Sequence, residues 1–188
     1  MVAVLNRRSD QTRTELMSAF SGLVFAKGFE NVTVKEIIAS AGIARSTFYE
    51  HFSNKEDVLR ACMTQFFGVI ADCASADEMP VDLLKVLDHL WTNRRLTDAI
   101  FSGYARMILA RNQADLVEQR LRAMAPLLLL PHRLAAIQIA DAQLGLVESW
   151  MRGRAPCSIE NLADGLFRSS RASALALIAE AAKDSSAG

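Results

Sequence analysis

The sequence has few residues that interrupt helices and no pattern typical of strands. Among its 188 residues there are only 4 prolines and 9 glycines. No stretch alternates apolar with polar residues over the length of a strand, whereas leucine and alanine are abundant. Together these features predict an all-helical protein. The chain is long enough to bury a core in one or two small domains.

Long apolar runs are missing as well. The longest purely apolar stretch extends from Met124 to Pro131, whereas a membrane-spanning helix needs about 20 apolar residues. Near the N-terminus, Arg7, Arg8 and Asp10 follow only a few apolar residues, which is unlike a secretory signal peptide. We therefore expect a cytoplasmic protein with no membrane segment.

Patterns of catalytic and metal-binding residues are also absent. There is no GxGxxG sequence, no Walker loop and no CxxC pair. The histidines are far apart, and none stands in a ligand motif: His51, His89 and His132. The odd number of cysteines fits a reducing compartment, and their spacing is not that of a metal site: Cys62, Cys73 and Cys157. We expect no enzyme activity, no metal and no cofactor; a thiol-based switch is an alternative to unreactive buried cysteines.

The charge of the chain is balanced, which by itself does not indicate a nucleic-acid partner. The formal net charge is zero, and residues 1–60 contain eight Lys and Arg against seven Asp and Glu. Six of these eight basic residues fall at positions suited to phosphate contacts: Arg7, Arg8, Arg13, Lys35, Arg45 and Lys55. A small dimeric module needs only a few such contacts, so we expect modest non-specific affinity for DNA.

The stretch from Thr33 to Leu59 has the pattern of a helix-turn-helix. A first short helix opens at Thr33, whose hydroxyl can cap free amides, and ends at Gly42, where glycine allows the left-handed conformation. The residues of its apolar face are Val34, Ile37, Ile38 and Ala41. A second helix covers residues 44–52, with Phe48 and Phe52 on its inner face. Its outer face presents polar side chains that suit a DNA major groove: Arg45, Ser46, Thr47, Tyr49, Glu50 and His51. Ser53 and Glu56 have the spacing of a capping box that starts the next helix.

These residues closely resemble the tetracycline-repressor (TetR) family of bacterial transcriptional regulators. The matching positions are Thr33, Ile37, Ala41-Gly42-Ile43, Thr47-Phe48-Tyr49, His51-Phe52, Lys55 and Leu59. The preceding helix also fits, with Phe20, Leu23 and Val24 buried and Lys27-Gly28-Phe29 closing it. One departure is Ala44, because the family often has a serine or threonine at this position to cap the recognition helix. The alternative is a helix-turn-helix used only for packing.

The resemblance implies a role for each residue of the predicted DNA surface. Arg45 would read a base, because its guanidinium can bind guanine O6 and N7 together; the alternative is a phosphate contact. Lys35, Ser46 and Thr47 would contact base edges or phosphates. The residues that resemble the family's backbone contacts are Thr33, Tyr49, His51 and Lys55, with Ala44 as the departure noted above. Glu50 would accept a hydrogen bond from cytosine or orient Arg45, and packing is the alternative for His51.

Helical periodicity continues through the rest of the chain. The expected helices run from Asn54 through Cys73, Val81 to Trp91, Asp98 to Ala110, Ala114 to Met124, Arg133 to Arg152, and onward from a cap at Ser158. We therefore expect a DNA-binding domain at residues 8–54 and an effector-binding and dimerisation domain at residues 55–183. The helix from Asn54 would connect the two, and residues 183–188 are expected to be disordered.

The resemblance also implies two sites in the second domain. The helix from Arg133 has two adjacent apolar stripes. Burying both of them requires two neighbours, the core of the same subunit and a partner chain. The expected dimer interface comprises Ile137, Ala140, Leu144, Val147, Met151, Leu162 and Leu166; the alternative is a monomeric core. The expected pocket for a small apolar or aromatic effector comprises His89, Trp91, Phe101, Tyr104, Arg106, Met107, Ile108 and Trp150; the alternative is ordinary core packing.

The interpretation of the sequence is an all-helical homodimer that binds a palindromic double-stranded DNA operator as a ligand-responsive repressor. Two recognition helices about 34–36 Å apart would read the two half-sites. The alternatives are a DNA-binding dimer without an effector, and an activator.

Overall fold

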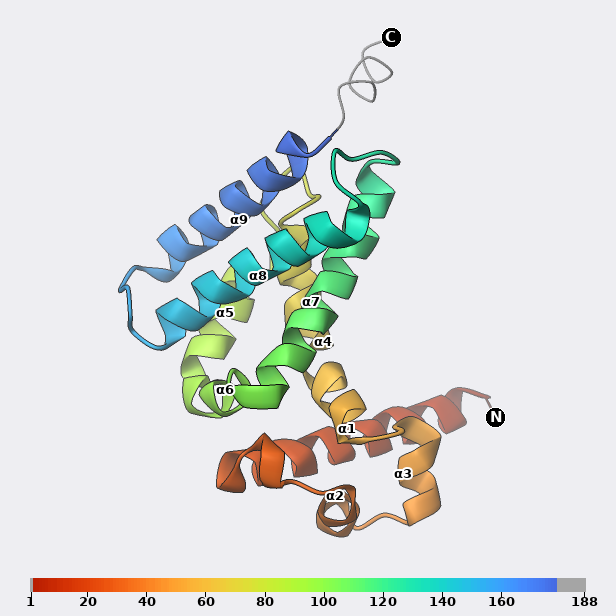
Figure 1. Cartoon of the computed structure of the whole chain (residues 1–188). Helices are drawn as coiled ribbons and strands as arrows, with labels where there is room; N and C mark the ends of the chain where they lie inside the picture. Colours follow the sequence, from red (N-terminus) through yellow and green to blue (C-terminus); the bar gives the residue numbers. More distant parts are fainter. Residues whose placement is uncertain (1, 179–188) are drawn as a thin grey trace. The chain divides into compact units, whose positions relative to one another are not determined.

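A computed structural model describes residues 2–178, with side chains described from residue 10 onward. Over this range the chain is helical and contains no strand (Figure 1). The helices are α1 (Val2–Lys27), the short 3-10 helix η1 (Phe29–Asn31), α2 (Val34–Ala41), α3 (Arg45–His51), α4 (Lys55–Asp72), α5 (Leu83–Thr92), α6 (Arg94–Ile100), α7 (Gly103–Met124), α8 (His132–Met151) and α9 (Ile159–Ala176). The predicted all-helical fold is confirmed. The predicted disorder of residues 183–188 and the side chains of Arg7 and Arg8 lie outside the described residues.

The chain divides into two compact units that are not continuous in sequence. The N-terminal unit comprises Met1–Met63 and Arg95–Ile108, and the C-terminal unit comprises Thr64–Arg94 and Leu109–Gly188. Both α4 and α7 therefore begin in the first unit and end in the second. The predicted domain boundary lies after residue 54, whereas residues 55–63 and 95–108 cluster with the N-terminal helices.

The core of the N-terminal unit is aromatic. Phe20 on α1, Phe29 in η1 and Phe48 on α3 are fully buried, and the rings of Phe20 and Phe29 meet edge to face at 6.1 Å. Ile37 on α2 and Phe52 after α3 are buried with them. These contacts fix α2 and α3 on α1 through the inner faces that the periodicity predicted.

The core of the C-terminal unit is built around α8, which lies beside α9 (Figure 1). Buried positions recur along α8 at Ala136, Ile139, Leu144 and Val147. A polar network adds to this packing. Gln113 Nε2 donates to Gln143 Oε1 at 2.7 Å, and Gln143 Nε2 donates to the Ile70 carbonyl at 2.9 Å and to Ser170 Oγ at 3.0 Å. The network therefore joins α7, α8, α4 and α9.

The helix boundaries differ from prediction between residues 94 and 124. The predicted break between Ala110 and Ala114 is absent, because α7 is continuous from Gly103 to Met124. No proline or glycine interrupts residues 104–124, so the helix has no reason to end there. The interruption lies earlier, at Gly103, whose φ of 54° separates α6 from α7.

The described residues include neither a membrane-spanning helix nor a cluster of metal-ligating side chains. Within residues 2–178, every helix is too short or too polar to cross a membrane. The same part of the chain has no group of three His, Cys, Asp or Glu side chains placed to hold a metal ion.

Candidate nucleic-acid interface

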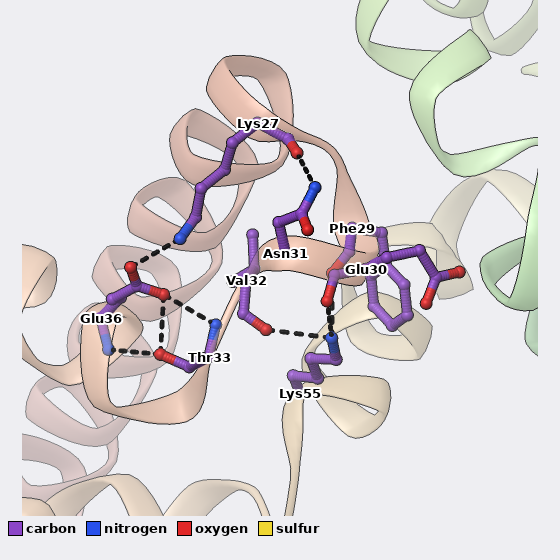
Figure 2. Close-up of polar contacts among 8 residues, drawn as sticks. All are labelled: Lys27, Phe29, Glu30, Asn31, Val32, Thr33, Glu36 and Lys55. Carbon is purple, nitrogen blue, oxygen red and sulfur yellow. Dashed lines mark hydrogen bonds and ion pairs between the residues drawn. The ribbon is translucent and has the colours of Figure 1, made fainter.

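The start of α2 is fixed by a reciprocal capping box (Figure 2). Thr33 Oγ1 accepts from the Glu36 amide at 3.4 Å, and the Thr33 amide donates to Glu36 Oε2 at 3.0 Å. Lys27 Nζ at the end of α1 lies 2.6 Å from Glu36 Oε1. Hydrogen bonds from Lys27 and then from Thr33 lower the pKa of Glu36 from 4.5 to about 2. The predicted cap at Thr33 is confirmed, and its hydroxyl is engaged within the protein.

The turn between α2 and α3 is the one expected from the sequence. Gly42 ends α2 in the left-handed conformation, with φ 66° and ψ 28°, which glycine adopts without steric cost. Ala44 then precedes α3 in an extended conformation and supplies no side-chain cap. The departure from the family pattern at Ala44 therefore leaves the first amides of α3 without a capping hydroxyl.

Helix α3 presents a polar face to solvent. Phe48 is fully buried, whereas Arg45, Ser46, Tyr49 and Glu50 are exposed. The Arg45 guanidinium lies 5.5 Å from the centre of the Tyr49 ring, which favours an extended arginine held against an aromatic face.

A pocket of about 270 Å³ lies between α2 and α3. Its lining residues are Val34, Lys35 and Ile38 from α2 with Arg45 and Tyr49 from α3. The structure thus brings together the two cations predicted to contact bases, Lys35 and Arg45, at one surface. Thr47 and His51 are half-buried at the edges of the same helix.

Lys55 has a different role from the one predicted (Figure 2). Its ammonium group donates to the carbonyl oxygens of Phe29 at 2.9 Å, Glu30 at 3.1 Å and Val32 at 3.0 Å. It also lies 4.5 Å from the centre of the Phe29 ring. An ammonium group has three hydrogens, and all three are used here. Lys55 is therefore not available as a phosphate contact, because it ties the first turn of α4 to η1.

Two further contacts were not expected from the sequence. The guanidinium of Arg13 on α1 lies 5.0 Å from the centre of the Phe52 ring, and the His51 ring lies 6.4 Å from the same ring.

The capping box predicted at Ser53 and Glu56 is wrong by one position. The Asp57 amide donates to Asn54 Oδ1 at 2.8 Å, and the Ser53 amide donates to Asp57 Oδ2 at 3.1 Å.

The residues predicted to line an effector pocket fall in both units. Five belong to the N-terminal unit: Phe101 and Ile108 are buried, Arg106 is half-buried, and Tyr104 and Met107 are exposed. The other three belong to the C-terminal unit: His89, Trp91 and Trp150. They therefore do not form one site within either unit.

The aromatic members of the C-terminal group have partners in the protein. The two tryptophans of the chain, Trp91 and Trp150, pack with their centres 4.7 Å apart. Trp150 Nε1 donates to the Cys157 carbonyl at 3.1 Å. His89 stacks on Phe66 at 4.7 Å. These contacts hold the side chains in the subunit and favour the packing alternative for Trp150.

Most of the residues predicted for the dimer interface face the subunit's own core. All but one of them are buried: Ala140, Leu144, Val147, Met151, Leu162 and Leu166. Their burial favours the alternative of packing in the subunit's own core, and the contact with a partner chain stays a prediction. Ile137 remains 39% exposed. The helical periodicity correctly predicted that α8 is apolar. It did not show which apolar stripe packs against α9 in the same subunit and which stays available to a second subunit.

The cysteines differ in their environments. Burial raises the pKa of the Cys62 thiol to about 11 and that of the Cys73 thiol to about 12. Cys157, in the connection between α8 and α9, is exposed. Cys73 is buried and Cys62 is half-buried, so the alternative of unreactive thiols fits both of them.

Comparison with known proteins agrees with this geometry. The family described as bacterial regulatory proteins, tetR family, matches residues 21–62. The uncharacterized HTH-type transcriptional regulator YxbF of Bacillus subtilis strain 168 is 32% identical over 69 residues, covering 36% of this chain and 18% of that protein. The chain likewise spans less than half the length of two further curated relatives, at 29% and 47%.

Solved structures share the fold over nearly the whole chain. A TetR transcriptional regulator from Streptococcus agalactiae 2603V matches with a TM-score of 0.55 at 20% identity, over 90% of this chain and 99% of that one. NalD, the secondary repressor of the MexAB-OprM multidrug efflux pump in Pseudomonas aeruginosa, matches with a TM-score of 0.54 at 22% identity, over 92% of this chain and 98% of that one. Residues 21–62 therefore match the helix-turn-helix of the tetR family of bacterial regulatory proteins, and the chain shares the fold of solved TetR regulators over most of its length.

Proposed function

We propose that this protein is a repressor that binds a palindromic DNA operator in the cytoplasm as a homodimer. The observation that carries the proposal is the outer face of α3. Arg45, Ser46 and Tyr49 are exposed there, while Phe48 behind them is fully buried and holds the helix in place. A short helix with an anchored back and a polar front is suited to the major groove.

Within this surface, Arg45 is the residue we assign to a base. It lies against Tyr49, and a guanidinium extended in this way can bind guanine O6 and N7 together. Lys35 lines the same pocket from α2 and would contact a base or a phosphate. Ala44, Ser46, Thr47, Tyr49 and His51 complete the proposed DNA surface, mainly through the backbone of the duplex. Thr33 lies at its edge as the cap of α2, because its amide and its hydroxyl both donate to Glu36. Lys55 is left out, because its donors are used within the protein.

For the homodimer, we propose the outward faces of α8 and α9. On α8 this face includes Ala142, Gly145 and Ser149 together with the exposed Ile137 and Leu146, and on α9 its small residues are Gly165, Ser169, Ala172 and Ala176. Small side chains allow helices of two subunits to approach closely. A two-fold interface formed by the same face of both subunits would place two α3 helices on successive half-sites.

We further propose that a small effector regulates DNA binding from the C-terminal unit. Gln113 is completely buried on α7, and among the described residues its Oε1 atom has no hydrogen-bond donor. A buried acceptor without a partner is costly, so a ligand carrying an N–H or O–H group would gain a strong contact there. A dimer without an effector, or an activator, would follow from the same DNA-binding surface and is the alternative.

The proposed assembly is tested by its stoichiometry on DNA. A purified palindromic duplex should bind two protomers, measured by sedimentation or light scattering, and a duplex carrying one half-site should bind far more weakly. Binding of one protomer with equal affinity to both duplexes would contradict the homodimer. Effector binding is tested separately by the fluorescence of the packed Trp91 and Trp150 pair and by the melting temperature.

A further inference from the structure

Glu30 makes contacts in two directions from the connection between α1 and α2. Its backbone carbonyl accepts a hydrogen bond from Lys55 Nζ at 3.1 Å. Its carboxylate points away from that contact, as Figure 2 shows, and Oε1 accepts a hydrogen bond from the Tyr104 amide at 3.1 Å. Glu30 and Tyr104 are 74 positions apart in sequence and belong to the same N-terminal unit.

The contact is made at the first turn of α7, which begins at Gly103. Amides in the first turn of a helix have no acceptor within the helix. A carboxylate there satisfies one of them and is stabilised by the positive end of the helix dipole. Glu30 therefore caps α7 from a distant part of the sequence.

Gly103 fits this arrangement in two ways. Its φ of 54° lies in the region that glycine adopts most readily. A Cβ atom added at this position would lie 3.2 Å from Glu30 Oε1, which is closer than side-chain carbons normally approach an oxygen. The absence of a side chain at residue 103 thus leaves room for the Glu30 carboxylate.

We propose that Glu30 is a positioning residue that fastens the first turn of α7 to the helix-turn-helix. Lys55 links the same short segment to the start of α4. Residues 95–108 cluster with the DNA-binding helices, and α7 then continues without a break into the C-terminal unit. A rearrangement of α7 would therefore act on the helix-turn-helix through Glu30. As a route of regulation, this inference rests on the proposed DNA-binding function.

The test compares Glu30→Ala and Glu30→Gln with Glu78→Gln, a matched change at an exposed carboxylate of the C-terminal unit. Amide hydrogen exchange is followed at Tyr104 and across residues 34–51. With Glu30→Ala we expect exchange at Tyr104 to accelerate at least about ten-fold and exchange in α2 and α3 to rise with it. Glu30→Gln should show a smaller change in the same direction, because a neutral amide oxygen remains an acceptor.

DNA affinity shows whether Glu30 positions the helix-turn-helix or only caps the first turn of α7. We expect Glu30→Ala to weaken operator binding about five- to ten-fold without changing its salt dependence, since Glu30 contacts no phosphate. Unchanged exchange at Tyr104, or faster exchange there with α2, α3 and operator affinity as in the wild type, would overturn the proposal. If the wild-type protein bound no DNA, the proposed function would fail, and exchange in α2 and α3 would still decide whether Glu30 fastens these helices to α7.

Discussion

The ammonium group of Lys55 lies 2.9 Å from the Phe29 carbonyl oxygen and 4.5 Å from the centre of the Phe29 ring. This residue pair joins α4 to the segment that leads into the helix-turn-helix. Because the carbonyls of Glu30 and Val32 accept the two remaining hydrogens, the lysine acts inside the protein.

Replacing Lys55 should therefore affect stability more than phosphate binding. We expect Lys55→Met to lower the free energy of unfolding by about 1.5–3 kcal/mol, the usual range for hydrogen bonds to a charged group. The salt dependence of DNA binding should be unchanged. As a control, Lys35→Met should reduce the salt slope by about one per half-site and leave stability within about 0.5 kcal/mol. A reduced slope with Lys55→Met at unchanged stability would restore Lys55 as a phosphate contact.

Arg45 should determine which base is preferred at one position of each half-site. Arg45→Ala should cost about 1–3 kcal/mol per half-site and relax specificity at that position. Arg45→Lys is a useful companion, because it keeps the charge and loses the two-pronged geometry. The measurement is binding to the operator and to single-base variants of it. An equal loss for all sequences would make Arg45 a phosphate contact.

The cap of α2 should make stability depend on acidity. The folded-state pKa of Glu36 is lowered from 4.5 to about 2, so its contribution is fully present above pH 4.5 and is lost as the pH falls toward about 2. Glu36→Gln should flatten this part of the stability profile, measured by denaturant unfolding between pH 5 and pH 2. The control is Glu15→Gln on α1. If both variants retained the wild-type slope, the capping box would not be the source of the dependence.

Substitutions on α8 should separate folding from dimerisation. Ala142 is exposed, and Ala142→Glu should dissociate the dimer in light scattering while the subunit stays helical. Leu144 is fully buried, and Leu144→Ala should cost about 2–5 kcal/mol of stability without a specific effect on association. Phe25→Glu, an exposed position on α1, serves as the control. A dimer that tolerates glutamate at residue 142 would place the interface elsewhere.

Thiol reactivity should distinguish the three cysteines. The raised pKa values of Cys62 and Cys73, about 11 and 12, leave very little thiolate at pH 8, whereas Cys157 is exposed. One equivalent of an alkylating reagent should therefore react quickly with the native protein, and Cys157→Ser should abolish that fast phase. Three equivalents reacting at one rate would show that the thiols of Cys62 and Cys73 are as reactive as that of Cys157.

Much of the helix-turn-helix could be predicted because its signals are local. Thr33 and Gly42 mark the ends of α2 through capping and backbone conformation, and Phe48 is buried as the helical period requires. These features depend on neighbours within a few residues. The surface of α3 follows from them, because a buried Phe48 leaves Arg45 and Tyr49 outside.

The errors concern contacts between residues far apart in sequence. Lys55 resembles a surface cation in the sequence, and only folding brings the carbonyls of residues 29–32 to it. Glu30 gave no signal, because its partner Tyr104 is 74 positions away. Likewise, the stripe containing Leu144 is apolar whether it meets the same subunit or a partner, so periodicity does not decide between them.

The most direct test of DNA recognition is selection of genomic fragments with the purified protein at a stated salt concentration, in parallel with Arg45→Ala. The proposed function predicts enrichment of a palindromic site whose half-sites are about one DNA turn apart. It also predicts that the Arg45→Ala protein loses its base preference at one position in each half-site. Recovery of no sequence above random fragments with the wild-type protein, with or without small molecules that raise its melting temperature, would contradict the account.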